Sequence, residues 1–244
     1  MSIQKTALIL GSTGQETRRS AVLSSKSSLP RRTLPASASL DAGTPRSTHL
    51  STGKEKLEQK VIDFEKLEAA GLSEGKWDVV FITLGTTAKA AGSSEAFERI
   101  DREYVINAAR AAKSEDHSQR LIYVSSAGAD PKSHFLYPRS KGLTEEGLAS
   151  LGYEDTIVFR PGLLAGTNRP ELRVGEKVAE AVTSFGSLFT SSLQIKIGTL
   201  AKSLIKVGEL GSAGLPPDAK ATQGGKDGAR FTLIGNSGAL ALAK

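Results

Sequence analysis

The chain has no cysteine among its 244 residues, and its three histidines lie far apart. Disulfide bonds, thiolate metal sites and a cysteine nucleophile are therefore excluded, and a histidine metal centre is not expected. No apolar run approaches the roughly 20 residues that a membrane-spanning helix needs. The polar start Met1–Lys5 runs directly into an apolar segment, which is not the pattern of a secretory signal peptide. These absences favour a globular domain that folds around an apolar core alone.

Acidic residues are missing between Glu16 and Asp41, inside a strongly basic segment. Residues 17–60 hold nine Lys or Arg and three Asp or Glu, so their excess equals the net charge of +6 of the whole chain. A basic protein can bind a polyanion. However, the rest of the chain is balanced, and the basic segment has no aromatic residue on which a base could stack. We therefore predict no nucleic-acid partner.

Apolar runs of strand length recur along the chain and lack the alternation of polar and apolar residues. Such runs indicate strands that are covered on both faces, as in a parallel sheet. The four clearest are Thr6–Leu10, Asp78–Leu84, Arg120–Val124 and Thr156–Phe159. Helical patterns, with apolar residues recurring at spacings of three and four, lie between them over Glu95–Lys113 and Pro138–Leu151. The alternation of strand and helix predicts one α/β domain with a doubly wound parallel sheet.

Two stretches do not continue this pattern. Residues 15–60 are rich in Ser, Thr, Arg, Pro and Ala without a sustained period, so we expect them to be irregular, although a doubly wound unit needs a helix and a strand there. The C-terminal part has amphipathic patterns at Val174–Phe189 and Ile195–Val207, a Gly/Pro/Lys-rich loop to Gly228 and an expected edge strand at Phe231–Ile234. We therefore divide the domain into a core at 1–166 and a smaller region at 167–244 that completes it.

A glycine-containing loop, Gly11-Ser12-Thr13-Gly14, follows the first strand. In doubly wound sheets, ligands bind beyond the carboxyl ends of the strands, and glycines there let the backbone approach a pyrophosphate. The third glycine of the GxxGxxG spacing is replaced by Thr17. The loop therefore indicates a dinucleotide site, with an ordinary glycine turn as the alternative.

Tyr137 and Lys141 lie four residues apart in a predicted helix that Pro138 suits in its first turn. This spacing places the phenol and the ammonium on one face, where the cation favours the phenolate and lets the tyrosine exchange a proton with a carbonyl or alcohol. Ser125 and Ser126 end the preceding strand, where a hydroxyl can donate to an oxygen that gains charge during hydride transfer. Taken singly, these features also suit a solvated pair and a turn.

Six stretches of the chain form a recognisable set: LILGSTG, RRTLPAS, FITLGTTAKAAGS, ERIDREYVINAARAAK, LIYVSSAGADPKSHFLYPRSKG and VFRPGLLAG. Together they resemble the short-chain dehydrogenase/reductase superfamily. They resemble most closely its atypical branch, which includes fungal oxidoreductases of mitochondrial proteomes and an animal Tat-interacting oxidoreductase. The resemblance implies a Rossmann-like fold, a C-terminal region that caps the substrate cleft, and NADPH as the cofactor.

The resemblance also implies roles for individual residues. Tyr137 would be the acid/base, Lys141 would also hold the nicotinamide ribose, and Ser126, with Ser125 as the alternative, would orient the substrate oxygen. The implied cofactor contacts are Gly11, Ser12, Thr13, Gly14 and Gln15 at the diphosphate, Arg31 and Arg32 at the 2′-phosphate, Asp63 at the adenine amino group, Gly85, Thr86 and Thr87 at the adenosine side, and Pro161, Gly162 and Leu163 at the nicotinamide. For the two arginines, a solvated basic loop is the alternative.

The chain departs from this family where it has QETRRSAVLSSKSSLP in place of an apolar helix and strand. This segment is either divergent or the product of an incorrectly spliced gene model, and a helix without an apolar face would pack poorly on the sheet.

We predict an NADPH-dependent oxidoreductase that acts on a small carbonyl or alcohol. The alternative is a non-enzymatic dinucleotide-responsive or interaction protein. The resemblance places it on the mitochondrial outer membrane as a peripheral protein, or in the cytoplasm.

Overall fold

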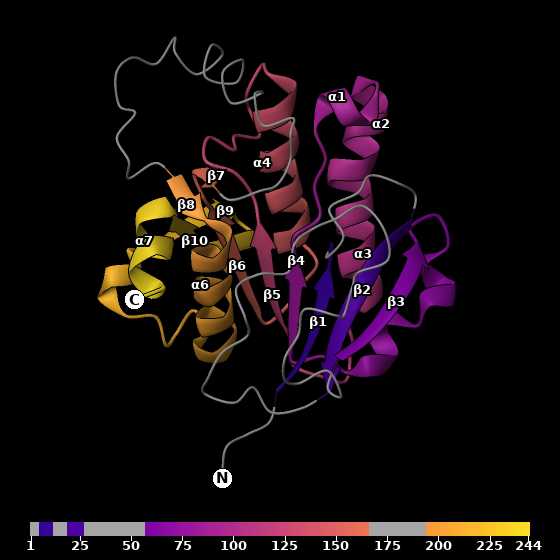
Figure 1. Cartoon of the computed structure of the whole chain (residues 1–244), viewed down its shortest axis with the longest axis horizontal. Helices are drawn as coiled ribbons and strands as arrows, with labels where there is room; N and C mark the ends of the chain where they lie inside the picture. Colours follow the sequence, from indigo (N-terminus) through magenta and orange to yellow (C-terminus); the bar gives the residue numbers. More distant parts are fainter. Residues whose placement is uncertain (1–4, 12–18, 27–56, 166–193) are drawn as a thin grey trace.

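The computed structural model describes residues 5–11, 19–26, 57–165 and 194–244 of the chain (Figure 1). Its main sheet has eight strands in the order β3-β2-β1-β4-β5-β6-β10-β9, and β7 and β8 form a small second sheet. The strands are β1 Thr6–Leu10, β2 Arg19–Lys26, β3 Leu57–Asp63, β4 Val79–Ile82, β5 Arg120–Val124, β6 Asp155–Arg160, β7 Leu163–Ala165, β8 Gln194–Lys196, β9 Thr222–Lys226 and β10 Ala229–Gly235. The helices are α1 Ala88–Ala91, α2 Ser94–Glu98, α3 Tyr104–Ala112, α4 Leu136–Ala149, α6 Ile197–Leu210 and α7 Asn236–Leu242, with a π-helical turn, η5, at Arg99–Glu103. Single 3-10 turns are η3 Leu67–Ala70, η4 Leu72–Gly75 and η7 Pro217–Ala219.

The centre of the sheet is parallel, as the sequence predicts. β1 pairs with β4, β4 with β5, β5 with β6 and β6 with β10, all in the parallel sense. The four predicted strands are all present, and the two predicted helices correspond to the continuous α2-η5-α3 segment and to α4. The predicted α/β fold with a Rossmann-like, mostly parallel sheet is therefore confirmed.

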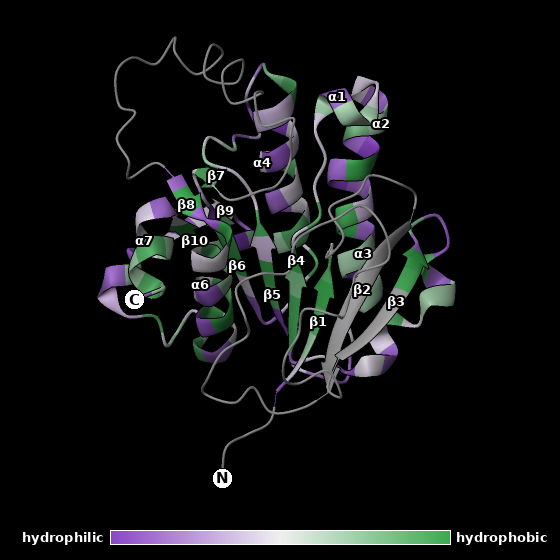
Figure 2. Ribbon diagram, in the orientation of Figure 1, coloured by the Kyte–Doolittle hydropathy of each residue, from purple (hydrophilic) through white to green (hydrophobic). Residues whose placement is uncertain are grey.

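Helices cover both faces of this sheet. Val80 and Ile82 of β4 point into one apolar core with α3 and α4, while Val79 and Phe81 point into a second core with α6. Because successive side chains of a strand point to opposite faces, a strand buried on both faces needs apolar residues at every position. This explains why the predicted strands lack alternation, and Figure 2 shows hydrophobic residues along the central strands.

The segment after β1 differs from the prediction. Residues 19–26 form β2, which runs antiparallel to β1 with Leu10 opposite Val22, and β3 pairs antiparallel with β2. A doubly wound unit would instead have a helix here and a parallel strand, which needs a crossover of a dozen or more residues. Eight residues separate β1 from β2, so the chain length alone requires an antiparallel return. The prediction that residues 15–60 are irregular is therefore wrong for 19–26 and 57–60, which are strands, whereas 15–18 and 27–56 lie outside the described residues.

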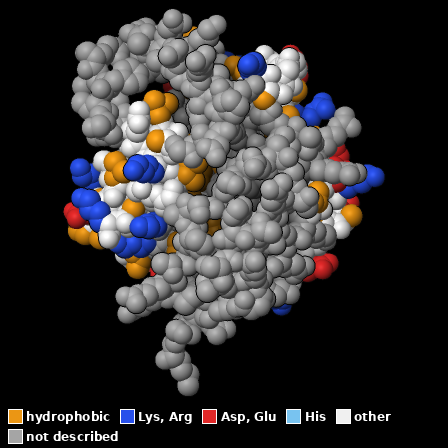
Figure 3. Space-filling model, in the orientation of Figure 1, with side chains coloured by type: hydrophobic (Ala, Val, Ile, Leu, Met, Phe, Trp, Pro, Cys, Tyr) orange, Lys and Arg blue, Asp and Glu red, His pale blue; other side chains and the backbone are white. Residues whose placement is uncertain are grey.

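The C-terminal region adds strands to the same sheet. The predicted edge strand at Phe231–Ile234 is β10, but it lies inside the sheet, and β9 is the edge. β9 falls within the stretch that the sequence suggested was a loop. The amphipathic pattern at Ile195–Val207 corresponds to α6, whose outer side carries the exposed Lys202 and Lys206; blue side chains surround this part of the surface in Figure 3. The pattern at Val174–Phe189 lies outside the described residues.

Candidate functional site

The site forms where β1, β4, β5 and β6 end, at the carboxyl edge of the parallel strands (Figure 1). Gly11 follows β1 with a φ of 102°, a region that L side chains rarely adopt. A Cβ at this position would lie 2.7 Å from the backbone nitrogen of Leu84. Glycine is therefore required for the chain to leave β1 in contact with the backbone that follows β4. Ser12, Thr13, Gly14, Gln15, Arg31 and Arg32 lie outside the described residues.

Lys141 is buried on α4, with 4% of its surface exposed. Its Nζ donates hydrogen bonds to Oδ1 of Asp101 at 2.9 Å and to the hydroxyl of Tyr123 at 3.1 Å. A Cβ on Gly85, just beyond β4, would lie 3.3 Å from the same Nζ. The ammonium is thus held under the end of β4, close to the backbone that Gly11 contacts.

Tyr137 lies one turn before Lys141 on the same face of α4, as the spacing predicts. Its ring centroid is 5.9 Å from Lys141 Nζ and 6.0 Å from the ring centroid of Phe97. The side chain is 43% exposed, and no partner within the described part of the chain hydrogen-bonds its hydroxyl. The ammonium therefore faces the phenol ring, while its hydrogen bonds go to Asp101 and Tyr123.

Electrostatics keep this cluster in a defined protonation state. Burial by itself would lower the pKa of Lys141, but the neighbouring Tyr123 and Asp101 outweigh it and raise the pKa above that of a free lysine. Burial also raises the pKa of the Tyr123 hydroxyl, against the opposing effect of Lys141. Lys141 is consequently a charged ammonium, and Tyr123 is a neutral phenol over the physiological range.

The two serines after β5 have different environments. Ser126 is partly exposed, and its Oγ donates to the carbonyl of Ala127 at 3.2 Å. Ser125 is buried, and its Oγ has no hydrogen-bond partner among the described residues. The structure therefore brings Ser126 to the surface of the site, while Ser125 points into the protein.

The loop after β4, which the resemblance assigns to the adenosine side of the cofactor, also makes contacts within the protein. The N–H of Thr86 points at Oδ1 of Asp101 at 3.4 Å, and Thr86 is buried. Thr87 is the N-cap of α1, since its side chain accepts a hydrogen bond from the N–H of Ala90 at 3.2 Å. Gly85 and Thr86 thus contact the buried ion pair, and Thr87 begins a helix.

The other predicted cofactor contacts are more dispersed. Asp63 ends β3, which two strands, β2 and β1, separate from β4. Pro161 is buried beyond β6, and its carbonyl accepts from the N–H of Ala127 at 3.0 Å. The N–H of Gly162 donates to Asn236 at 2.9 Å, and Leu163 is 42% exposed at the start of β7. The Pro161–Leu163 segment therefore lies beside the loop that follows Ser125 and Ser126. Asp63 lies on β3, at the edge of the sheet beyond β1 and β2.

Asp101 was not among the predicted site residues. It is completely buried in η5 and faces Lys141. A signal exists in the sequence, since position 101 falls in phase with the core-facing Phe97, Val105 and Ala108 of the same helical segment. A charge at an apolar position of a helical pattern needs a partner, and Lys141 is that partner. Tyr123 was also missed, because it lies inside an apolar strand.

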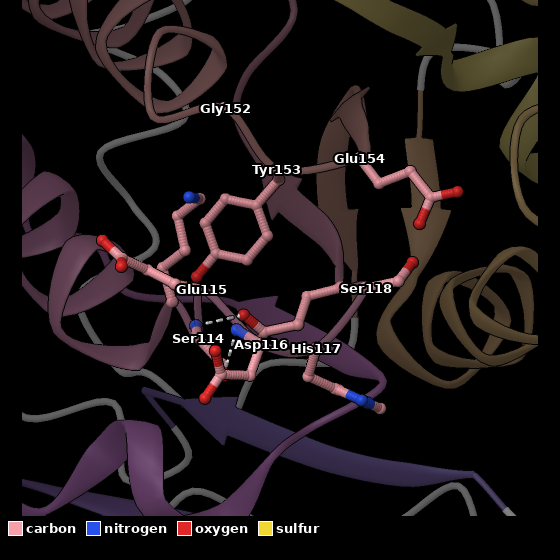
Figure 4. Close-up of a pocket in the computed structure, with 10 residues that line it drawn as sticks. Ser114, Glu115, Asp116, His117, Ser118, Gly152, Tyr153 and Glu154 are labelled. Atoms are coloured by element: carbon pink, nitrogen blue, oxygen red, sulfur yellow. Dashed lines mark hydrogen bonds between the residues drawn. The ribbon is translucent and has the colours of Figure 1, made fainter.

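A pocket of about 390 Å³ lies elsewhere, at the amino ends of β5 and β6 (Figure 4). It is lined by residues 113–119 and 152–154, and it includes none of the predicted site residues. This pocket is therefore separate from the predicted catalytic and cofactor residues. No group of three or more His, Asp or Glu side chains within the described ranges could hold a metal ion. No helix in those ranges is long and apolar enough to cross a membrane.

Comparisons with known proteins agree with the resemblance. No family profile matches the chain. A protein named HTATIP2 from Rattus norvegicus is 37% identical over 152 residues, which is 61% of each chain. A protein named fmp52, mitochondrial, from Emericella nidulans is 46% identical over 101 residues, or 41% of this chain and 42% of the relative. The matches thus span about half of these relatives' length. The predicted resemblance to this atypical branch is confirmed.

A solved structure, RMD from Pseudomonas aeruginosa complexed with NADPH, superposes on 59% of each chain with a TM-score of 0.43 and 15% sequence identity.

Proposed function

We propose that the chain is an NADPH-dependent oxidoreductase that interconverts a small carbonyl compound and its alcohol. The observation that carries this proposal is the buried Lys141 ammonium facing the ring of Tyr137, whose hydroxyl is available at the carboxyl edge of the sheet. A cation near a phenol stabilises the phenolate, which is the form that remains after the tyrosine gives up its proton.

The described part of the site fits a dinucleotide. Gly11 lets the backbone leave β1 against Leu84, as a phosphate-binding first loop requires. Lys141 Nζ lies against Gly85 at the neighbouring strand end, where it can meet a hydroxyl-rich ligand. NADPH, when bound, would supply a hydride to the carbonyl carbon.

The residues of the chain would then handle the oxygen. Tyr137 would donate its hydroxyl proton to the carbonyl oxygen as that oxygen gains negative charge, which completes the alcohol and leaves a phenolate. Lys141 would stabilise the phenolate without giving up its own proton, because its pKa is raised. Ser126 would donate a hydrogen bond to the same substrate oxygen. In the oxidation direction each proton moves the opposite way.

The test compares Tyr137→Phe with the wild-type protein. NADPH fluorescence measures binding, and the consumption of NADPH with an aliphatic aldehyde, an aromatic aldehyde and an α-diketone measures turnover. We expect Phe at 137 to abolish turnover while binding is retained, since the ring and its contact with Phe97 remain.

Tyr153→Phe is the matched control, because Tyr153 is a buried tyrosine outside this site whose hydroxyl donates to the carbonyl of Ala109. It should retain turnover. Equal turnover of the wild-type and Tyr137→Phe proteins would remove the proposed acid/base.

One observation favours a second candidate, a non-enzymatic interaction protein. β2 runs antiparallel to β1 and starts at Arg19, where a dinucleotide-binding unit would have the helix that meets the diphosphate. This candidate predicts that titration calorimetry detects no NADPH binding. Binding in the micromolar range or tighter would exclude it.

We also propose that the protein is mitochondrial and peripheral on the outer membrane. The support is the name of the fungal relatives, which are called mitochondrial. Exposure of intact mitochondria to protease tests this location, because a protein on the outer surface is degraded and an internal one is protected.

A further inference from the structure

Asp101 is a carboxylate with no exposed surface. Its Oδ1 accepts from Lys141 Nζ at 2.9 Å and lies 3.4 Å from the N–H of Thr86, and its Oδ2 lies 3.5 Å from Oγ of Ser140. A buried carboxylate is costly unless it is paired and hydrogen-bonded. Each of these contacts is a hydrogen-bond donor, so both carboxyl oxygens of Asp101 face a donor.

The helix is modified where Asp101 lies. Residues Arg99–Glu103 form a π-helical turn between α2 and α3, which are regular. Single π turns inside α-helices are rare and occur often at functional sites. Asp101 occupies a core-facing position of this segment, between the buried Phe97 and Val105. The wider turn therefore carries a charged side chain at a position that an apolar residue would otherwise fill.

Lys141 has three Nζ hydrogens, and Asp101 and Tyr123 accept two of them. The third hydrogen has no acceptor among the described residues, and the rings of Tyr123 and Tyr137 lie 5.5 and 5.9 Å from Nζ. A side chain at position 85 would press on both members of the pair, since a Cβ there would be 3.3 Å from Nζ and 3.4 Å from Oδ1 of Asp101. Glycine at position 85 therefore leaves just enough room for the ion pair.

We propose that Asp101 is a positioning residue, which keeps Lys141 charged and fixed beneath the ring of Tyr137 with one Nζ hydrogen left for a ligand. Its effect on catalysis rests on the proposed function, whereas its effect on the charge of Lys141 does not. Tyr123 also favours the charged lysine, but its own pKa is raised by burial, so it is a neutral phenol in this pH range and Asp101 is the anion beside Lys141. Without Asp101 no anion would oppose the effect of burial, which would lower the pKa of Lys141.

The titratable groups around Lys141 are few. Asp101 comes from η5, Tyr123 from β5 and Tyr137 from α4 itself. The next acid on α4, Glu145, is engaged by Arg160 of β6 through two hydrogen bonds. Asp101 is thus the one carboxylate that contacts the ammonium within the described part of the chain.

The first test measures stability against pH for the Asp101→Asn protein. In the wild type the pKa of Lys141 is raised in the folded state. Its contribution to the free energy of unfolding is therefore constant below the pKa of lysine in the unfolded chain, about 10.4, and is lost only as the pH rises further. With Asn at 101 the folded pKa falls below the unfolded one, so the unfolded state binds more protons and stability rises with pH. We expect the unfolding midpoint of this variant to rise, relative to wild type, between about pH 7 and pH 10.

Glu145→Gln is the matched control. Glu145 is 1% exposed, lies on α4 and has a cationic partner, Arg160, in place of a lysine. An arginine side chain is always charged in proteins, whereas a buried lysine readily changes its pKa. This variant should lose stability without a pH slope. The Asp101→Asn, Lys141→Met double variant should also lose the slope, because the titrating amine is gone.

Two outcomes overturn the proposal. One is an Asp101→Asn midpoint that runs parallel to wild type from neutral to alkaline pH. The second concerns folding at neutral pH. If Asp101→Asn does not fold there, the proposal requires that the Asp101→Asn, Lys141→Met double variant folds, because it lacks the unpaired buried amine. If neither variant folds, Asp101 serves only to hold the helix.

The second test uses turnover. In Asp101→Asn, kcat should fall toward alkaline pH, by about tenfold or more once the pH exceeds the lowered pKa of Lys141. The pH profile of kcat for Glu145→Gln should keep the wild-type shape. If wild-type protein does not bind NADPH, the proposed function fails, while the stability slopes still decide the role of Asp101.

Discussion

The two sides of β4 are built differently. On one side, β5 and β6 continue the parallel sheet, and α4 brings Tyr137 and Lys141 to the end of β5. On the other side, β1 is parallel to β4, but β2 and β3 return as antiparallel strands. The side that would carry the proposed acid/base has the parallel strands of a doubly wound sheet, whereas the side that would carry the cofactor phosphates returns in the antiparallel sense. The proposed function therefore depends on how much of the second side NADPH needs.

The two sides meet where Gly11 contacts the backbone that follows β4, and Gly11→Ala should disrupt this contact. The substitution places a side chain at positive φ and 2.7 Å from the backbone of Leu84. Backbone strain and overpacking together should cost about 2–4 kcal/mol of unfolding free energy. Urea denaturation measures this loss.

Gly128→Ala separates the two causes in this experiment. Gly128 has a φ of 82°, but a Cβ there would meet nothing within 4 Å. Only the strain of about 1–2 kcal/mol should remain. Equal losses for the two variants would mean that the first loop does not lie against β4.

The second prediction asks whether β2 is as integral to the sheet as β5. Leu23 pairs with Ile9 of β1 and with Gln59 of β3, so a proline there removes a ladder donor from an interior strand. Leu23→Pro should cost about 1–3 kcal/mol from the unpaired acceptor alone. Thermal unfolding is the measurement, and Ile122→Pro in β5 is the reference.

The comparison would change if Leu23→Pro left the midpoint unaltered while Ile122→Pro lowered it. In that case β2 and β3 would contribute little to the stability of the domain, and the cooperatively folded sheet would consist of β1, β4 and the strands beyond β4.

The sequence predicted the parallel side well because its elements are locally determined. The run VVFI, at Val79–Ile82, is apolar at every position and is buried on both faces, and the spacing of Tyr137 and Lys141 fixes their shared helix face. The antiparallel side was not predicted, because RSAVLSSK has one short apolar cluster and its pairing with β1 and β3 depends on tertiary contacts. β9 was missed for the same reason, since TQGGK has turn-like composition and becomes a strand by pairing with β10.

The site shows the same division between local and tertiary information. Tyr137, Lys141 and the two serines were predicted from spacing and from their places at element ends. The hydrogen-bond acceptors of Lys141 come from η5 and β5, distant in sequence, so spacing along α4 could not identify Asp101 or Tyr123.

The smallest predicted effect concerns the loop that leads from β4 toward Asp101. Thr87 caps α1 by accepting from the N–H of Ala90 at 3.2 Å, and the preceding Thr86 points its N–H at Asp101. Thr87→Ala should cost about 0.5–1 kcal/mol through the lost cap, and Thr87→Ser should retain most of it. Urea denaturation measures both. Because the loop backbone stays in place, Thr87→Ala should not acquire the alkaline loss of kcat that is expected for Asp101→Asn. An alkaline loss of kcat in Thr87→Ala would mean that the cap, and hence the loop, keeps Lys141 charged together with Asp101.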